Sequence, residues 1–545
     1  MADATYDAIV IGGGTSGLTV ANYLVKYGGL KTAIFEARPE LGGGWGSEDL
    51  VPGFIANTHA AEVRRYYTLP LEWDFPLKER GFEFLEYPVA RGTIFKEDLS
   101  SFCIYSPEAD PSGERSAASL AKFSRRDADT WLWLTELYHR YIKDAVVKSL
   151  FNPPPPPGEP NPLEKLWLDL CKRWPERIDP AFLVRSELEI WRDLFENEAV
   201  IAALCRHVHS ITGTSPDIPG GGAGRLFAIL CMVADTGAWR GGTHSLAHIM
   251  SRIFVEAGGE FFTKSEVERV IIDNGRARGV RLVDGTEVKA RQLVVSTLDP
   301  ASLCFRLIGK EHLPFRLAQR VAHLDRWRIC ITWYGWAVHE LPHYRTAESD
   351  PDIDRAGRLV LTRKDPLAMV KNHAWRRLGM MCPELNLCVW GHTSIDPTQA
   401  AEGKHALGSE DFVLPATSMS AEEWKEFKRK HAEDTVREWS HYAPNMTWDN
   451  VIGYLPLTPV DATNCANFGP EGCWAVIDMV PSQMGGCRPA PELAQHRTPI
   501  AGLYATGAGW HRGGGGSSTH GYNCYKVIAR ELNLGKPWEA SDRPF

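Results

Sequence analysis

The segment Gly12–Gly17 has the residue types and the spacing of a phosphate-binding turn. Its glycines stand at positions 12, 13, 14 and 17, directly after the short apolar stretch Asp7–Ile11, and those at 12, 14 and 17 have the spacing of the fingerprint. In such a turn Gly12 permits the tight bend, Gly14 lets the backbone approach a pyrophosphate, and Gly17 lets the following helix pack closely on the strand. The spacing therefore predicts the first half of a dinucleotide-binding unit.

Two neighbouring features complete this unit. Thr15 and Ser16 begin a helix whose free N–H groups and partial positive charge favour phosphates. A second strand, Thr32–Phe35, ends at Glu36, about 20 residues beyond the glycines, where a ribose-binding carboxylate is expected. An acidic residue at this place disfavours a 2′-phosphate, so NADP is not expected. The alternative of a plain strand-to-helix turn has little support, but the motif does not separate FAD from NAD.

Titratable side chains gather around a second group of glycines near the other end of the chain. His511, Arg512, His520, Tyr522 and Tyr525 follow or flank Gly502–His511, which we call the C-terminal glycine segment. Histidine and tyrosine can transfer protons, and arginine can hold a carboxylate or an enolate oxygen. The alternative is that some of these side chains only cap or pack against the last helix.

A third pattern, Cys205-Arg-His207-Val-His209, alternates residue types that bind metals. No other residue of the sequence completes a set of four ligands, so we expect no metal site here.

The elements that must position these residues follow from the hydrophobic pattern. We expect helices over most of 117–148, onward to about 209, over 246–257 and over 522–532. We expect a small β-meander over 266–295, mixed α/β structure over 306–484 and a last strand at 502–506. The prolines 153–157 predict an extended linker. Between the second strand, Thr32–Phe35, and about Leu99 we expect loops with short strands.

Composition narrows the class of protein. The chain has 545 residues, 44% of them hydrophobic, and a formal charge of −8, which favours a packed globular protein without a general attraction for nucleic acid. Its 12 cysteines form no CxxC pair, which indicates free thiols in a reducing, cytoplasmic setting. We expect no signal peptide before the first strand, because residues 1–4 lack a basic stretch followed by apolar residues, and no run reaches the ~18 apolar residues of a transmembrane segment.

Several motifs resemble the FAD-dependent amine oxidase and phytoene desaturase superfamily. Glu36-Ala37-Arg38, followed by Gly42-Gly43-Gly44-Trp45, is similar to its "EAR…GG" element, and the C-terminal glycine segment is similar to its flavin-contacting stretch. His511 before the glycines 513–515 resembles the branch of bacterial phytoene desaturases and retinol saturases. Where that branch usually has proline, this chain has Arg512.

Inner motifs agree with the same branch in order along the chain. They are Gly241-Gly242-Thr243, Ser265-Glu266-Val267, Val294-Val295-Ser296-Thr297 with Asp299-Pro300, Asp396-Pro397 with Gly403-Lys404-His405, Arg488-Pro489 and Thr498-Pro499. The resemblance implies FAD as cofactor, bound by Gly12, Gly14, Thr15, Ser16, Gly17, Glu36, Ala37, Arg38, Gly43, Gly44, Trp45, Val267, Ser296, Gly507 and Ala508.

The resemblance also implies an α/β fold with a discontinuous, glutathione-reductase-like Rossmann domain for FAD. We expect this domain over 1–99, 225–305 and 485–545, with an inserted mixed α/β substrate domain over 100–224 and 306–484. Asn57-Thr58-His59 would then reach the flavin, with His59 as a general base or, in the interpretation we favour, as a polar wall of the pocket.

The implied activity is that of a dehydrogenase or desaturase. Such an enzyme moves a hydride from a saturated carbon to flavin N5 while a base takes the proton from the neighbouring carbon, so that a C=C bond forms, with oxygen or quinone as electron acceptor. The polar group Arg512, Ser517, Ser518, Thr519 and His520 favours a small, partly polar substrate, such as a cyclic ketone or acid, over a long polyene. The alternatives are an amine oxidase, a carotenoid-type desaturase, a saturase, and a catalytically quiet FAD-binding scaffold.

Overall fold

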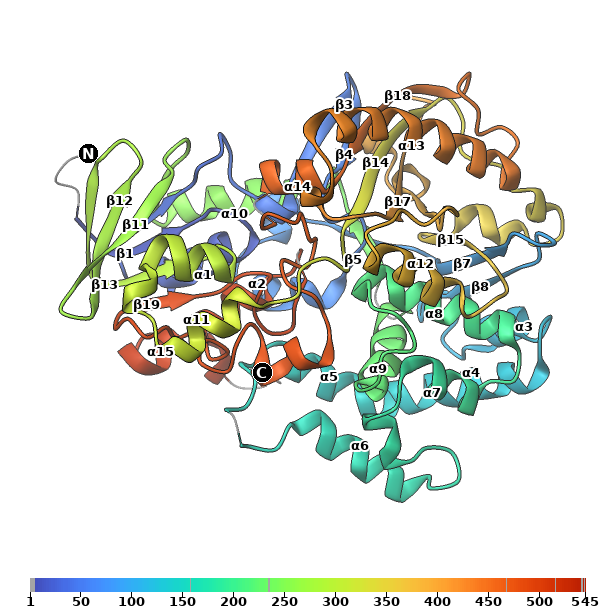
Figure 1. Ribbon diagram of the computed structural model, residues 1–545, viewed down its shortest axis with the longest axis horizontal. Helices are drawn as coiled ribbons and strands as arrows, with labels where there is room; N and C mark the ends of the chain where they lie inside the picture. The colour runs from blue at the N-terminus through green and yellow to red at the C-terminus, as the bar shows by residue number, and fades with distance from the viewer. Residues whose placement is uncertain are drawn as a thin grey trace.

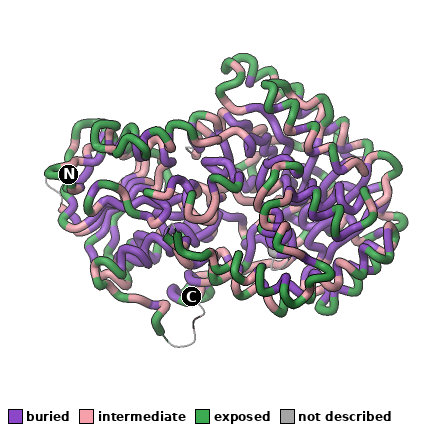
Figure 2. The backbone as a smooth tube through the Cα atoms, turned by 60° about the horizontal axis from the view of Figure 1, so that its bottom comes forward, coloured by how far each residue is buried: buried purple, intermediate pink, exposed green. Residues whose placement is uncertain are grey.

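Two seven-stranded sheets form the framework of the molecule. The computed structural model describes residues 5–156, 158–233, 236–466, 468–514, 516–540, 543 and 545. Residues 1–4, Pro157 and Gly515, which belong to features discussed above, lie outside the described residues. Figure 1 shows the first sheet, with β1 and β13, on the left, and the second sheet, with β14 and β17, on the right. Buried backbone fills the interior of both halves (Figure 2).

The first sheet is built around a parallel core. Its strands are β1 (Thr5–Ile11), β2 (Thr32–Phe35), β10 (Glu260–Phe262), β11 (Val267–Asp273), β12 (Arg276–Leu282), β13 (Glu287–Ser296) and β19 (Leu503–Ala505). The order β10-β2-β1-β13-β19 is parallel throughout, whereas β12 and β11 add to β13 as an antiparallel meander. The strands β1 and β2 are almost fully buried because helices cover the sheet.

Three helices pack on this sheet near its centre: α1 (Thr15–Lys26), α10 (His244–Glu256) and α15 (Thr519–Leu532). Helix α1 lies between the other two, and its Asn22 donates a hydrogen bond to the Met250 carbonyl of α10 at 3.1 Å. The strand–helix–strand unit predicted for the N-terminal residues, the meander and the last helix are confirmed. The α/β fold class with a Rossmann-type sheet is confirmed with them.

The second sheet has the order β18-β14-β17-β16-β15-β7-β8. Its strands are β7 (Val89–Phe95), β8 (Ser101–Tyr105), β14 (Ile331–Val338), β15 (Leu359–Thr362), β16 (Cys388–Gly391), β17 (His405–Phe412) and β18 (Val451–Leu457). Every residue of β7 is buried, so its sequence lacks the polar alternation of a half-exposed strand. This is why the sequence predicted loops and short strands where the structure has a seven-residue strand between β15 and β8.

Helices cover the second sheet and extend below it in Figure 1. Trp439 of α13 (Ala421–Tyr442) packs in one buried cluster with Trp336 of β14, and α8 (Glu198–Thr212) contacts β15. The helices α3 (Glu114–Leu120), α4 (Arg125–Leu137), α5 (Lys143–Leu150), α6 (Pro162–Arg173), α7 (Glu187–Leu194) and α9 (Gly222–Val233) surround α8. The helical pattern predicted for 117–148 is interrupted near Ser124, whose side chain caps α4 through Asp127 N.

Smaller elements lie between the strands of the two sheets along the chain. They are β3 (Ser47–Val51), β4 (Phe54–Asn57), β5 (Val63–Arg64), β6 (Phe84–Glu86), β9 (Thr236–Trp239), α2 (Leu69–Asp74), α11 (Phe315–Ala322), α12 (Ala368–Arg377) and α14 (Pro459–Ala466). The cysteines that the structure describes are free thiols, most of them buried. Within the described residues, no helix combines the length and the apolar character that crossing a membrane requires.

Candidate functional site

A cavity of about 320 Å³ opens at the carboxyl ends of the central parallel strands. Ile11 ends β1, Phe35 ends β2 and Thr297 follows β13, and all three residues line the cavity. The N-terminus of α1 also faces it, through Thr15 and Ser16. In open parallel sheets, ligands bind at this edge.

The structure places most of the predicted cofactor residues in the lining. They are Gly12, Gly14, Thr15, Ser16, Glu36, Ala37, Arg38, Gly43, Gly44, Val267, Gly507 and Ala508. These residues come from segments that are far apart in the sequence, and the sheet brings them to one edge. This meeting depends on β19 pairing with β13. Local sequence patterns do not give that pairing, and the expectation that these segments meet came from the family resemblance.

Three predicted cofactor residues lie behind the lining. Gly17 packs so closely on the turn that a Cβ there would be 2.0 Å from the Gly12 carbonyl oxygen. Trp45 is buried and donates a hydrogen bond from Nε1 to the Gly516 carbonyl at 3.0 Å. Ser296 is buried at the end of β13, and its hydroxyl accepts from Leu298 N at 3.3 Å. These three residues lie behind the cavity surface and support the residues that form it.

The glycine turn is tightly packed at Gly12 but leaves space on the cavity side at Gly14. Gly12 has φ +92°, and a Cβ there would lie 2.4 Å from Thr297 Oγ1. At Gly14 the nearest atom to an added Cβ is Gly43 Cα, at 3.7 Å. Gly14 is also the N-cap of α1, and no side chain caps this helix end. The turn therefore presents uncapped N–H groups to the cavity, as an anion-binding helix terminus does.

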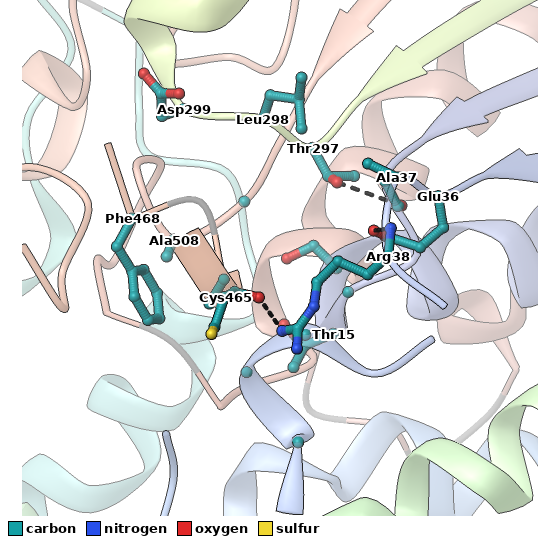
Figure 3. A pocket seen from close by; sticks show the side chains of 18 of the residues that line it. Thr15, Glu36, Ala37, Arg38, Thr297, Leu298, Asp299, Cys465, Phe468 and Ala508 are labelled. Carbon is teal, nitrogen blue, oxygen red and sulfur yellow. Dashed lines mark hydrogen bonds between the residues drawn. The ribbon is translucent and has the colours of Figure 1, made fainter. Parts of the chain in front are cut away.

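Glu36 is held in a single orientation by the backbone. Its Oε2 accepts a hydrogen bond from Gly13 N at 2.7 Å, and its Oε1 accepts one from Arg38 N at 2.9 Å. Arg38 extends across the cavity and donates from Nη1 to the Cys465 carbonyl at the end of α14. Figure 3 shows Glu36 and Arg38 on one side of the cavity and Phe468 and Ala508 on the other.

Sequence reasoning missed part of this lining. The missed residues are Glu40, Gly46, Glu48, Arg306, Thr463, Asn464, Cys465, Ala466, Phe468 and Val476. Thr58, Glu266, Leu298, Asp299 and Gly509 stood within or between the quoted motifs but were not named as cofactor residues. Arg306 donates from Nη1 to Glu266 Oε1 at 3.0 Å and to the Val267 carbonyl at 2.9 Å. The Leu298-Asp299 pair stood inside a recognised motif, whereas α14 carries no sequence signal that links it to the glycine turn.

His59 lies beside the cavity in an aromatic setting. Its ring centroid is 5.3 Å from that of Phe468, which lines the cavity, and 6.1 Å from that of Trp474. Burial lowers the pKa of His59 to about 3, and the positive charge of Arg38 acts in the same direction. The imidazole is therefore neutral near pH 7. Asn57, two residues earlier, donates a hydrogen bond to Gln399 Oε1 at 2.8 Å, which fixes the segment that carries His59.

The residues after the C-terminal glycine segment are brought together, but outside the cavity lining that the structure describes. His511 Nε2 lies 3.1 Å from the Ser149 carbonyl, and burial lowers the pKa of His511 to about 4. The guanidinium of Arg512 lies over the Tyr67 ring at 4.5 Å. His520 is buried in the first turn of α15, and burial lowers its pKa well below the usual value.

The two tyrosines belong to the core rather than to the cavity edge. Tyr522 is fully buried and packs against Tyr23 of α1 at 5.3 Å and against Phe151 at 5.9 Å. Tyr525 donates its hydroxyl hydrogen to the Gly535 carbonyl at 2.7 Å. Both project from the face of α15 that packs on α1, which a sequence without tertiary contacts cannot distinguish from the opposite face.

The Cys205, His207 and His209 side chains are buried at separate places around α8. His207 Nε2 lies 3.2 Å from Thr93 Oγ1, and His209 Nδ1 lies 2.9 Å from the Thr214 carbonyl. Within the described residues, no group of three or more histidine, cysteine, aspartate or glutamate side chains is arranged to hold a metal ion.

Known proteins resemble this chain in part or over most of its length. Residues 10–67, which contain the glycine turn and Glu36, match the family described as NAD(P)-binding Rossmann-like domain. Over 97% of its length the chain is 27% identical to pyridine nucleotide-disulfide oxidoreductase domain-containing protein 2 of Mus musculus, covering 94% of that protein. It is 24% identical to one of the subunits of a limonene dehydrogenase from Castellaniella defragrans, with coverage of 98% and 96% of the two chains.

A desaturase and a solved oxidase structure extend the comparison. A 4,4′-diapophytoene desaturase of Methylomonas is 25% identical over 62% of this chain and 63% of its own. A solved structure of a putrescine oxidase variant superposes with a TM-score of 0.59 at 15% identity, covering 97% of this chain and 99% of the other. This structural likeness shows the fold alone.

The chain is therefore similar, at 24–27% identity, to proteins named as an oxidoreductase-domain protein, a dehydrogenase subunit and a desaturase, and its fold is similar to that of a putrescine oxidase. The expected resemblance to phytoene desaturases is confirmed at this low identity. Its finer assignment to the branch of phytoene desaturases and retinol saturases stays a prediction.

Proposed function

We propose that this chain is a FAD-dependent oxidoreductase of the dehydrogenase or desaturase type. The observation that carries the proposal is the single cavity edge that joins the uncapped α1 N-terminus, the oriented Glu36 carboxylate and the backbone of Gly507 and Ala508. The first two match the pyrophosphate and adenosine ribose of a dinucleotide. The third lies farther along the same cavity, where the redox-active ring of FAD would be held.

The proposed division of labour follows from these contacts. Bound FAD would supply a two-electron acceptor that takes a hydride at N5 from a saturated carbon. The backbone amides of the glycine turn would hold the phosphates, and Glu36 would hold the ribose. The division of the chain into a FAD domain over 1–99, 225–305 and 485–545 and a substrate domain over 100–224 and 306–484 belongs to this proposal.

The substrate side of the cavity favours an apolar molecule. Phe468 and Trp474 stack at 5.6 Å, and Trp333 of β14 lies 6.2 Å from Trp474. His59, with a pKa lowered to about 3, is a weak proton acceptor, which supports its role as a neutral polar wall. We infer a small, neutral, largely apolar substrate with a saturated C–C bond, and oxygen or quinone as the final acceptor. This replaces the partly polar substrate expected from the group around Arg512 and His520, because that group lies outside the described cavity lining.

An amine oxidase is the second candidate, because the same aromatic wall suits an amine above a flavin ring. Anaerobic mixing distinguishes the candidates. The purified protein is mixed without oxygen with panels of cyclic ketones, apolar alkenes and amines while the visible absorption of the flavin is recorded. Bleaching by a ketone or hydrocarbon supports the dehydrogenase, and bleaching by amines alone supports the oxidase. Purified protein without bound flavin contradicts both.

A further inference from the structure

Arg488 is a fully buried cation directly behind the C-terminal glycine segment. Its Nε donates a hydrogen bond to the Trp510 carbonyl at 3.0 Å, and its Nη2 donates to the Ala508 carbonyl at 3.0 Å. Ala508 lines the cavity, so one peptide group separates the guanidinium from the cavity wall. Gly513 passes over the same guanidinium, because a Cβ at Gly513 would lie 2.8 Å from Arg488 Cζ.

Backbone carbonyl groups are the main hydrogen-bond partners of this guanidinium among the described residues. Besides the two carbonyls of the C-terminal glycine segment, it donates to the carbonyls of Ala475, Ile477, Asp478 and Gln483 at 2.9–3.2 Å. Among the described residues, no carboxylate forms an ion pair with Arg488. The carboxylate of Asp478 accepts hydrogen bonds from Arg328 Nη1 at 2.8 Å and from Arg328 N at 2.9 Å, so its negative charge acts on Arg488 through space and without a direct ion pair.

The charge of Arg488 acts on its surroundings. Burial lowers the pKa of Arg488 itself to about 10, which leaves it protonated near pH 7. Burial also lowers the pKa values of His511 and His520, and the positive charges of Arg512 and Arg488 act in the same direction. A cation without a carboxylate partner in a dry interior is only partly screened, so its field extends to the cavity.

We propose that Arg488 both positions the C-terminal glycine segment and supplies a fixed positive charge that favours negative charge on the group held in the cavity. Its six carbonyl contacts fasten this segment to residues 475–483, which include Val476 of the cavity lining. This inference rests on the proposed function, because the charge would make two-electron reduction of a bound flavin more favourable.

The test measures the midpoint potential of the bound flavin in an anaerobic titration against reference dyes. In Arg488→Met we expect the equilibrium constant for reduction to fall at least tenfold, about 30 mV for a two-electron couple. Arg488→Lys keeps the charge and should stay near the wild-type potential even where it melts at a lower temperature. Arg206→Met removes another fully buried arginine, on α8, and should leave the potential unchanged.

A second pair of variants serves if Arg488→Met does not fold. Met484 Sδ lies 4.0 Å from Arg488 Nη1, so Met484→Glu would place a carboxylate against the guanidinium, and Met484→Gln is its uncharged control of similar size. Met484→Glu should lower the equilibrium constant for reduction at least tenfold relative to Met484→Gln. Equal potentials in this pair, or in wild type and Arg488→Met, would overturn the inference. Wild-type protein without flavin would instead overturn the proposed function.

Discussion

Replacing Gly14 by valine tests the assignment of the cavity to a dinucleotide without disturbing the protein itself. Gly14 has φ −71° and ψ −171°, which any residue can adopt, and the nearest heavy atom to an added Cβ is 3.7 Å away. The new side chain would therefore occupy the cavity and not the core. If it displaces the pyrophosphate from one or two charge-assisted hydrogen bonds, each worth about 1.5–3 kcal/mol, affinity falls by about 3 kcal/mol. That loss is roughly 100-fold in Kd.

The assay is a FAD titration of the apoprotein, followed by quenching of flavin fluorescence, together with a thermal melt of the apoprotein. Gly17→Ala is the matched control, because its Cβ would lie 2.0 Å from the Gly12 carbonyl. Such overpacking destabilises a protein by about 1–3 kcal/mol, so this variant should melt earlier even without FAD. Gly14→Val should melt like the wild type and lose affinity. Wild-type affinity in Gly14→Val would refute the placement of the pyrophosphate at this turn.

Three further predictions concern single side chains. Glu36→Ala should weaken FAD retention while the spectrum of the flavin that remains bound is unchanged, and a large band shift would show that Glu36 lies near the ring instead. Arg512→Met should slow flavin reduction in stopped-flow measurements while FAD stays bound, whereas a lower melting temperature with an unchanged rate would make its contact with Tyr67 purely structural. Burial lowers the pKa of His496 from 6.5 to about 4. Between pH 6.5 and pH 4 the unfolded chain therefore binds more protons than the folded chain, so the stability of the folded protein falls as the pH decreases through this range. Between pH 7.5 and 5 this loss should be about 2 kcal/mol, and denaturant titrations of His496→Gln should show a correspondingly flatter pH dependence.

The sequence predicted those parts of the molecule that depend on interactions between residues close together in the chain. The turn Gly12–Gly17, Glu36 and the meander over 266–295 each depend on a few neighbouring residues, and the structure has them where they were expected. The strand β7 was missed because burial on both faces removes the alternation that marks a strand. Helix α15 begins at Thr519, before the predicted Tyr522, because its start lies among glycines and small polar residues.

The candidate site also depends on contacts between residues that are far apart in the sequence, which the sequence pattern did not predict. Arg38, Cys465 and Phe468 meet at one cavity although more than half of the sequence lies between the first and the other two. Nothing in the composition of α14 distinguishes it from an ordinary surface helix. The position of Tyr522 in the core likewise depends on which face of α15 packs against Tyr23, and this is settled only by tertiary contacts.

The pairing of β19 with β13 has a consequence for how the chain folds during its synthesis. A ribosome releases Gly12–Gly17 and Glu36 early, but Gly507 and Ala508 leave the exit tunnel long afterwards. Until then, one wall of the cavity does not exist. A nascent chain then has only the part of the site that we propose for the adenosine half of a dinucleotide. Because a ligand that binds only the completed site stabilises the folded state by mass action, cofactor supply would influence how much newly made protein survives quality control.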